Sequence, residues 1–319
     1  MITANLAEKV LIDPIRRGMD SLFIIAGYAT PTMASWHIKQ IQMMELRPIE
    51  IKLVVGMCCY DGLTADVHEG FKALSKMRNN AEGLSGFTCQ YVFEGPPVHS
   101  KLFIWSQEGI PYEAYAGSAN YTQAAFGSSR RELLTQCDPL QAYDYFNQIE
   151  AHSMFCTHPE IEQYIMIRSA HPVLDGESPS VERLRGLEIR SVTLSFITRT
   201  GDTGARSGLN WGQRPGREPN QAYIPLPSHI ARSGFFPLNG KHFAVTTDDG
   251  KQLILRVEQA NDKAITTPLN NSQIGEYFRN RLGLPNGACV SRADLERYGR
   301  TDVTFYKLDE ETYFMDFSV

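Results

Sequence analysis

Residues 98–105 read VHSKLFIW, residues 117–122 read GSANYT and residues 130–134 read RRELL. The first segment sets the fold, because its apolar end, Leu102 to Trp105, is typical of a strand that is buried on both faces. His99 and Lys101 stand just before that run and are separated by one residue. Side chains alternate between the two faces of an extended strand, so the imidazole and the ammonium are predicted to project to the same side.

The second segment supplies polar groups for the same place. A short strand-like run ends in a turn at 117–120, where backbone N–H groups, the Ser118 hydroxyl and the Asn120 amide can all donate hydrogen bonds to an anion. Glu132 opens a third apolar run. A carboxylate there is placed to accept the second ring N–H of His99 and thereby to fix its tautomer.

A histidine two residues before a lysine is weak information by itself. The chain holds a second copy, His37-Ile38-Lys39, inside a helical pattern at 32–44, and no Gly-Ser-x-Asn turn follows it. For that copy we expect a structural role. The first copy could likewise be an ordinary pair at a strand edge, but its combination with the turn and with Glu132 is much more specific.

At these residues the chain resembles the phospholipase D superfamily, and within it the nucleases that carry one His-x-Lys and Gly-Ser-x-Asn motif per chain. The resemblance implies that His99 is the nucleophile that forms a phosphohistidine, and that Lys101 and Asn120 hold non-bridging phosphate oxygens. It also implies that Ser118 is the turn serine and that Glu132 orients the histidine. The longer family pattern has an aspartate where this chain has Ser106. Because that aspartate does not need to touch the phosphate, the difference affects the assignment to a subfamily more than the expected chemistry.

The length of 319 residues predicts two domains, and the hydrophobic content of 42% is enough to form a core in each. No apolar run reaches the roughly 18 residues of a membrane span, and the first residues do not form a signal peptide. We therefore expect a cytoplasmic protein without a membrane partner. The six cysteines, at 58, 59, 89, 137, 156 and 289, form no Cys-x-x-Cys pair. They are expected to be reduced, and no metal site is predicted.

The net charge of −5 is distributed unevenly. Residues 1–180 hold 13 basic and 20 acidic residues, whereas residues 181–319 hold 18 basic and 16 acidic residues. Several arginines of the second part cluster in one stretch, which matters more for phosphate contact than the total charge does.

Helical and strand-like segments alternate in the first part of the chain. Helices are predicted at 5–17, 32–44, 65–78, 138–155 and 159–167, and strands at 22–28, 49–55 and 87–93, beside the strands around the motif. This alternation predicts a mixed sheet with flanking helices. In Asp138-Pro139 the aspartate suits a helix N-cap and the proline suits the first helical position.

The pattern changes after a predicted linker at 169–181, which separates domains at 1–168 and 182–319. Short alternating segments follow, at 188–198, 222–226, 242–247, 252–258, 303–308 and 312–317, and Asp248-Asp249-Gly250 predicts a hairpin between two of them. One helix is expected at 273–282, capped by Asn271 and ended by Gly283. Several short strands with few helices predict a small, all-β barrel.

A long polar loop, 199–221, lies between the first two strands of this barrel. Arginine, asparagine and glutamine read base edges through paired hydrogen bonds, so the loop is either a DNA-contacting segment or a disordered surface loop, and we favour DNA contact. The predicted DNA-binding residues of this loop are Arg199, Arg206, Asn210, Trp211, Gln213, Arg214 and Arg217.

The second part resembles the pseudobarrel DNA-binding domain of plant transcription factors, the B-three type, which also serves as the specificity domain of some restriction enzymes. Such domains grip DNA with two arms. The resemblance implies that the 199–221 loop is the first arm and that the second arm lies near Asn261 and Lys263. Over nearly its full length the chain resembles the NgoFVII-type restriction endonucleases. This resemblance implies a site-specific, metal-independent endonuclease that acts on double-stranded DNA, works as a homodimer and needs no cofactor for its chemistry. An ATPase or helicase-like subunit, which would bring ATP dependence, and a cognate DNA methyltransferase are the further partners that such a system implies.

Two other functions compete with this one. The first is a phosphodiesterase that acts on lipid head groups, but phospholipases of the superfamily generally carry two motifs in a longer chain. The second is a DNA-binding regulator with an inert nuclease domain, against which the intact His99, Lys101, Asn120 and Glu132 argue.

Overall fold

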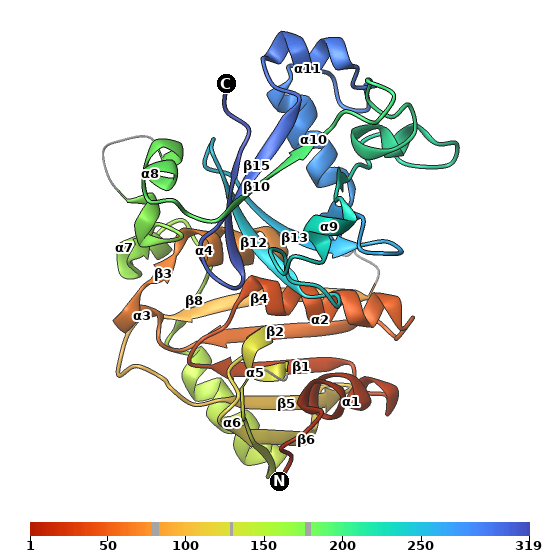
Figure 1. Ribbon diagram of the computed structural model, residues 1–319. Coiled ribbons are helices and arrows are strands. Elements are labelled where there is room, and N and C mark those ends of the chain that lie inside the picture. Colours follow the sequence, from red (N-terminus) through yellow and green to blue (C-terminus); the bar gives the residue numbers. More distant parts are fainter. Residues whose placement is uncertain (78–82, 128–129, 176–179) are drawn as a thin grey trace. The chain divides into compact units, whose positions relative to one another are not determined.

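The computed structural model describes residues 1–77, 83–127, 130–175 and 180–319. The chain forms two compact units, Met1–Ser169 and Ala170–Val319 (Figure 1). The predicted linker, 169–181, contains the short helix η2 (Pro172–Leu174) and the first residues of α8 (Ser180–Gly186), and its residues 176–179 lie outside the described part. None of the helices in the described ranges has both the length and the apolar character that a membrane crossing needs.

The first unit is built on one seven-stranded sheet. Its strands, in spatial order, are β7 (Leu134–Cys137), β6 (Ile110–Gly117), β5 (Leu102–Gln107), β1 (Ser21–Ala26), β2 (Ile49–Val55), β4 (Leu84–Val92) and β8 (Ser153–Phe155). The central pairs β1–β2 and β2–β4 are parallel, and the other pairs are antiparallel. The predicted mixed sheet is therefore confirmed.

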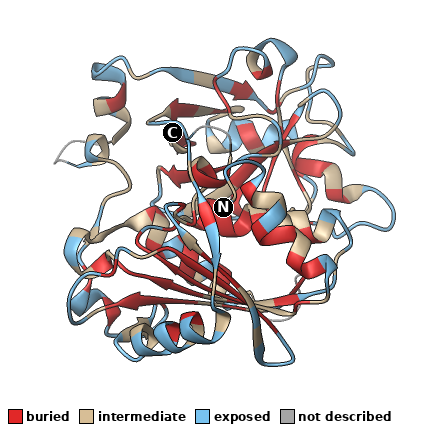
Figure 2. Cartoon of the chain, turned by 90° about the horizontal axis from the view of Figure 1, so that it is seen from below, coloured by how far each residue is buried: buried red, intermediate tan, exposed pale blue. Residues whose placement is uncertain are grey.

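Helices cover both faces of this sheet, and the buried residues follow its strands (Figure 2). On one face, α6 (Pro139–Glu150) packs Ala142 and Phe146 against a cluster that includes Phe23. On the other face, Trp105 Nε1 donates to the carbonyl oxygen of Val10 at 2.7 Å. The remaining elements of the unit are η1 (Ala7–Ile12), α1 (Asp13–Arg16), α2 (Pro31–Met43), α3 (Cys58–Asp61), β3 (Leu63–Thr64), α4 (Ala65–Lys76), α5 (Gln123–Phe126), α7 (Ile161–Tyr164) and β9 (Ile167–Arg168).

Two predicted helices of the first unit are too long. The helix at 138–155 ends at Glu150, because the chain turns there and β8 joins the edge of the sheet beside β4. The helix at 159–167 shrinks to the single turn of α7, and β9 then pairs with β3. The predicted N-cap is confirmed, since the Asp138 carboxylate accepts the Gln141 N–H at 2.8 Å.

The second unit is a seven-stranded sheet that curls toward closure. Its order is β10 (Ser191–Ser195), β15 (Asp302–Lys307), β16 (Thr312–Asp316), β12 (His242–Thr247), β13 (Gln252–Glu258), β14 (Ala264–Thr266) and β11 (Ile224–Pro225). The two end strands, β10 and β11, approach each other. Apolar side chains such as Phe243 and Tyr313 fill the interior, so the predicted all-β barrel is confirmed.

Helices and turns complete the second unit. They are η3 (Gly208–Gln213), α9 (Ser228–Ala231), α10 (Ser272–Arg281) and α11 (Arg292–Tyr298), beside η2 and α8. The hairpin at Asp248-Asp249-Gly250 is confirmed by the antiparallel β12–β13 pair. The capping role predicted for Asn271 is wrong, because its φ of −63° and ψ of −10° are helical and its side chain makes no cap bond. The sequence patterns did not predict α11 or β14.

Candidate active site

The predicted histidine and lysine contact each other at one end of the first unit's sheet. Lys101 Nζ lies 3.0 Å from Nδ1 and 3.1 Å from Nε2 of His99, and donates to the His99 carbonyl oxygen at 2.6 Å. The prediction that the two side chains share a side is confirmed. His99 is exposed, whereas Lys101 is only 8% exposed. The imidazole is therefore accessible to a substrate, and the ammonium lies next to it with little access to water.

The buried ammonium is electrostatically well placed. Burial lowers the pKa of Lys101, and attraction to the nearby Glu132 carboxylate acts in the opposite direction. A charge with few competing water dipoles interacts more strongly with an anion than the same charge in open solvent. Lys101 is thus suited to stabilising negative charge on a phosphate that reaches His99.

Two glycines let the histidine segment approach the sheet. Val98 N–H donates to the carbonyl oxygen of Gly56 at 3.1 Å, and a Cβ at Gly56 would lie 2.0 Å from the Val98 oxygen. A Cβ at Gly27 would lie 3.2 Å from His99 Cδ2. Position 56 therefore requires glycine for close backbone packing. Sequence reasoning missed this pair, although Gly56 directly follows the predicted strand 49–55 and Gly27 lies near the end of the predicted strand 22–28.

The Gly-Ser-x-Asn turn lies beside this pair because β6 runs antiparallel to β5. Gly117 N–H donates to the Lys101 carbonyl oxygen at 3.3 Å. Asn120 Oδ1 accepts the backbone N–H of Tyr28 at 3.0 Å. Since that bond occupies the oxygen side of the amide, the two N–H groups of Asn120 are the donors that a phosphate would meet.

Glu132 contacts the turn serine. The Ser118 hydroxyl donates to the Glu132 carboxylate and accepts the N–H of Leu133 at 3.1 Å. All five predicted catalytic residues therefore gather at one end of the sheet, but a bond from His99 to Glu132 is not among the contacts of the described residues, in which Lys101 meets both ring nitrogens. The orienting role of Glu132 stays a prediction.

Tyr28 is a neighbour of the site that the sequence patterns did not reveal. Its ring meets the His99 ring edge-on, with centroids 6.0 Å apart, and its hydroxyl donates to Asp61 Oδ2 at 2.6 Å. The hydrogen bond to Asp61 therefore fixes the Tyr28 phenol. The Tyr28 ring in turn limits the orientations that the His99 imidazole can adopt. The only signal in the sequence was the position of Tyr28 as the last residue of the predicted strand 22–28.

Two features of the motif analysis lie away from this site. His37, in the second His-x-Lys copy, is fully buried on α2, where its ring nitrogens contact Tyr121 Oη at 2.9 Å and the Leu11 carbonyl oxygen at 3.1 Å. Burial lowers the pKa of His37 to about 4, so it is neutral and structural, as expected. Ser106, in place of the family aspartate, is buried and pairs with Ser21 on β1, toward the other end of β5 from His99.

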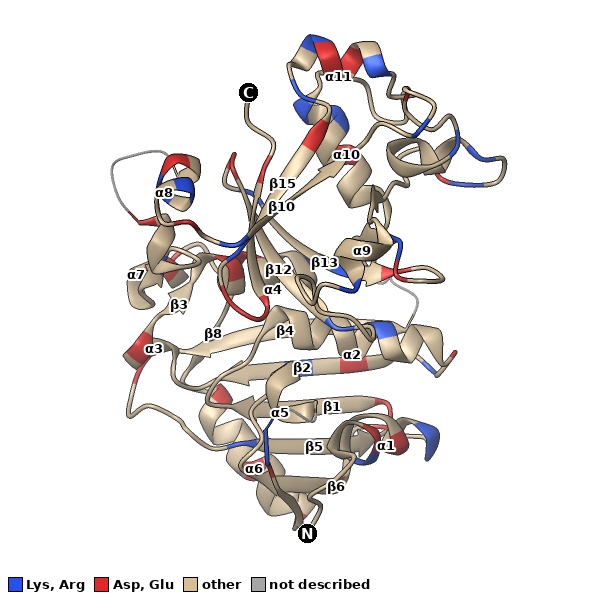
Figure 3. Ribbon diagram, viewed as in Figure 1, with Lys and Arg blue, Asp and Glu red and all other residues tan. Residues whose placement is uncertain are grey.

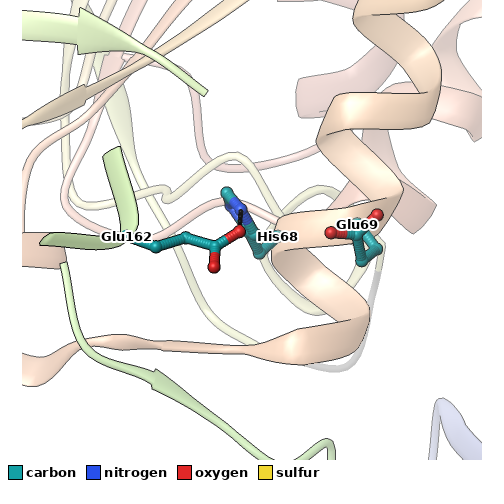
Figure 4. A group of neighbouring side chains, drawn as sticks. All are labelled: His68, Glu69 and Glu162. Atoms are coloured by element: carbon teal, nitrogen blue, oxygen red, sulfur yellow. Dashed lines mark ion pairs between the residues drawn. The ribbon is translucent and has the colours of Figure 1, made fainter. Parts of the chain in front are cut away.

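One group of side chains in the described residues has a geometry that could hold a metal ion. It consists of His68 and Glu69 on α4 and Glu162 on α7 (Figure 4). Lys72 Nζ already lies 2.7 Å from Glu69 Oε1 and 3.6 Å from Glu162 Oε1. Because the ammonium supplies the positive charge between these carboxylates, the group is better explained as a tie between α4 and α7 than as a metal centre.

The predicted DNA-contacting loop of the second unit is partly ordered by η3, and basic residues are spaced along it (Figure 3). The Arg217 guanidinium lies 3.9 Å from the centre of the Trp211 ring and donates to Gln221 Oε1 at 3.1 Å. Arg214 Nε donates to the Arg206 carbonyl oxygen at 2.8 Å. The arginines at 199, 206, 214 and 217 are all exposed. The exposed guanidinium groups are therefore carried by a loop that η3 and these contacts hold in a folded framework.

Two predicted DNA-binding residues form hydrogen bonds within that framework. Asn210 is fully buried, and its amide bonds Val290 N and Val290 O at 2.8 Å each and the Gly204 carbonyl oxygen at 3.1 Å. A direct DNA contact by Asn210 is therefore wrong, because its amide is used within the fold. Gln213 is half-buried and donates to the Gly287 carbonyl oxygen at 3.0 Å.

The second predicted arm joins β13 to β14. Asn261 and Lys263 are both exposed there, and Asn261 has a φ of 63°, a left-handed turn conformation that asparagine tolerates. Both side chains are accessible to a partner, and their DNA contact stays a prediction.

Arg279 on α10 fixes the first loop from inside, a role the sequence patterns missed. It is fully buried and donates only to backbone carbonyl oxygens among the described residues, including those of Leu209 at 3.0 Å and Pro219 at 3.3 Å in the loop. It also donates to Ala288 O at 2.8 Å. One side chain thus joins the start of η3 and the 219–220 turn to α10 and to the segment that follows it.

Comparison with known proteins agrees with both units. Residues 4–163 match the model of the NgoFVII restriction endonuclease N-terminal PLD domain, and residues 184–309 match that of the NgoFVII C-terminal B3-like DNA-binding domain. No curated protein matches the chain in sequence.

Among solved structures, NucT from Helicobacter pylori is 16% identical, with a TM-score of 0.31, over 47% of this chain and 90% of NucT. Polyphosphate kinase from Porphyromonas gingivalis is 12% identical, with a TM-score of 0.34, over 59% of this chain and 28% of the kinase. Both TM-scores are low, so neither structure tells more about this chain.

Proposed function

Because the chain belongs to the NgoFVII restriction endonuclease family, and is thus a phospholipase-D-like endonuclease with a DNA-binding domain, we propose that it cleaves double-stranded DNA through a covalent phosphohistidine on His99. The observation that carries this proposal is the exposed His99 imidazole in contact with the buried Lys101 ammonium, beside a turn of hydrogen-bond donors. Nucleophile, cation and amide donors within one small site are what a two-step phosphoryl transfer requires.

The proposed reaction has two displacements. A ring nitrogen of His99 attacks the phosphorus, the bond to one sugar oxygen breaks, and that oxygen takes a proton from a second imidazole. Water then attacks the phosphorus, gives its proton to the same imidazole, and displaces His99. Lys101 and the amide N–H groups of Asn120 hold the non-bridging oxygens through both steps. The Ser118–Glu132 hydrogen bond keeps the turn in place.

The second imidazole is predicted to come from another copy of the chain. The route needs a nucleophile and an acid, and two His99 residues related by a two-fold axis supply both. We expect a homodimer, measurable by sedimentation, whose dissociation on dilution lowers the cleavage rate per chain. A protein that stays monomeric and still cleaves DNA at the full rate would rule out the shared site.

Cleavage is predicted to need no divalent metal. Lys101, Asn120 and their two-fold mates supply the charge neutralisation that metal ions give to many nucleases. We expect the cleavage rate in EDTA to equal that in magnesium within about twofold. Loss of activity in EDTA and its return with magnesium would contradict this, once an ATP-dependent partner has been removed from the assay.

We assign sequence recognition to the 199–221 loop. Arg214 donates through Nε within the loop, and its two terminal nitrogens bond no other described residue, so they can take paired acceptors on a base. Arg214→Ala is expected to weaken specific binding by about 1–3 kcal/mol and to relax specificity at one base position. Arg217→Ala should weaken binding too, and it also removes the guanidinium that stacks on Trp211.

Binding titrations on matched specific and random duplexes measure both effects. If Arg214 touches only a phosphate, binding weakens equally on all sequences and the salt dependence falls. Arg297→Ala is the control, because this exposed arginine lies on α11 and pairs with Asp294 at 3.0 Å. Unchanged binding in both loop variants would contradict the assignment.

A further inference from the structure

A groove of about 670 Å³ opens directly beside the Ser118–Glu132 pair in the first unit. Residues 3–6 line one wall, residues 130–133 line the other, and residues 125–127 contribute apolar surface. The catalytic motif includes neither the first wall nor the two arginines at 130 and 131. The groove is therefore continuous with the candidate site but extends beyond it.

The wall formed by residues 3–6 is part of the fold. Ile2 N–H donates to Leu134 O at 2.6 Å, and Leu134 N–H donates to Ile2 O at 2.9 Å, so the segment is tied to β7 immediately before it enters the groove. Leu6 is buried, and the Asn5 carbonyl oxygen accepts the N–H of Lys9 at 3.0 Å. The wall of the groove at residues 3–6 is thus anchored by hydrogen bonds to the rest of the unit.

The lining of the groove has the chemistry of a nucleotide site. Arg130 and Arg131 are exposed, and neither forms an ion pair with any residue of the described ranges. They stand in a part of the chain that is acidic overall, with 13 basic and 20 acidic residues in 1–180. Ala125 and Phe126 add an apolar surface. Guanidinium groups suit phosphate, and a space of ~300–1,000 Å³ with apolar lining accommodates a sugar and base.

We infer that this groove holds the nucleotide next to the cleaved phosphodiester, and that Arg130 and Arg131 bind the phosphate flanking the one attacked by His99. The inference rests on the proposed nuclease function and extends it to a defined neighbouring position on the strand. Ser118 and Glu132 of the candidate site line this groove, whereas His99 does not, so a nucleotide in the groove would lie beside the attacked phosphate and not over it.

The test uses duplexes of a cleaved sequence in which one phosphate at a time is replaced by an uncharged methylphosphonate. The full-length protein and its Arg130→Ala/Arg131→Ala variant are compared in single-turnover cleavage. We expect the unaltered protein to slow about tenfold when one flanking phosphate is neutral, because a charge-assisted contact is lost. The double variant should be about tenfold slower on ordinary DNA and insensitive to that same replacement.

Two further variants make the result specific. Arg130→Lys/Arg131→Lys keeps the charge and should recover much of the rate, whereas Arg168→Ala removes an exposed arginine from β9, outside the groove, and should leave the rate unchanged. A double alanine variant that cleaves at the normal rate, or that responds to every neutral phosphate as the unaltered protein does, overturns the inference. Failure of the unaltered protein to cleave any DNA instead overturns the proposed function itself.

Discussion

Replacing His99 with alanine is expected to reduce DNA cleavage by at least ~10⁴-fold, because it removes the imidazole that is proposed to form the covalent bond to phosphorus. Specific DNA binding should stay nearly unchanged, since it is assigned to the second unit. Single-turnover cleavage and binding titrations on the same duplex measure the two quantities separately. His158→Ala, an exposed histidine of the same unit, is the matched control.

Residual cleavage above about a tenth of the normal rate in the His99 variant would contradict the assignment. Loss of binding and cleavage together would mean that the substitution disturbs the fold or that the two functions are not divided between the units. Thermal unfolding of the variant separates these two outcomes.

Arg279→Ala is expected to have the largest effect on the recognition unit. The substitution removes the guanidinium donor from several carbonyl oxygens, among them the buried oxygen of Leu209 and the partly buried oxygen of Ala288. Such groups cost about 1–3 kcal/mol each, so the free energy of unfolding should fall by about 3–5 kcal/mol. We also expect faster amide hydrogen exchange across the 199–221 loop and loss of preference between specific and random DNA.

The comparison with Arg279→Lys isolates the role of the guanidinium. A lysine keeps the charge but cannot reach the same set of carbonyl oxygens with one ammonium. It should restore only part of the stability and of the DNA preference. An alanine variant with normal exchange in the loop and normal discrimination would show that Arg279 does not position the recognition surface.

The parts of the site that could be predicted from the sequence are local. His99 and Lys101 share a side because one residue separates them on an extended segment, and the turn at 117–120 reaches them because β5 and β6 form a hairpin. The apolar run at Leu102 to Trp105 likewise predicted a central strand. In each case, spacing within a few residues determines the geometry.

The parts that could not be predicted depend on contacts between distant segments. Asn210 looked like a base-reading residue because its loop is polar, but it bonds Val290, which is 80 residues away. Arg279 is a charged residue on α10 and nevertheless lies inside the unit. Gly56 is needed only because Val98 crosses above it. Composition and periodicity contain no information about such contacts between distant segments.

The same limit explains the errors in secondary structure. The segment at 138–155 has a continuous helical pattern, but its last three residues gain more by pairing with the free edge of β4 than by extending α6. Edge pairing depends on where the chain returns in space, which the local pattern does not encode.

The stereochemical course at phosphorus tests the covalent route most directly. A duplex with a phosphorothioate of one configuration at the cleaved position is hydrolysed in ¹⁸O-labelled water, and the configuration of the product is determined. Two in-line displacements, with His99 as the first nucleophile, predict retention of configuration. Inversion would mean that water attacks the DNA phosphate in a single step, and it would contradict the phosphohistidine intermediate.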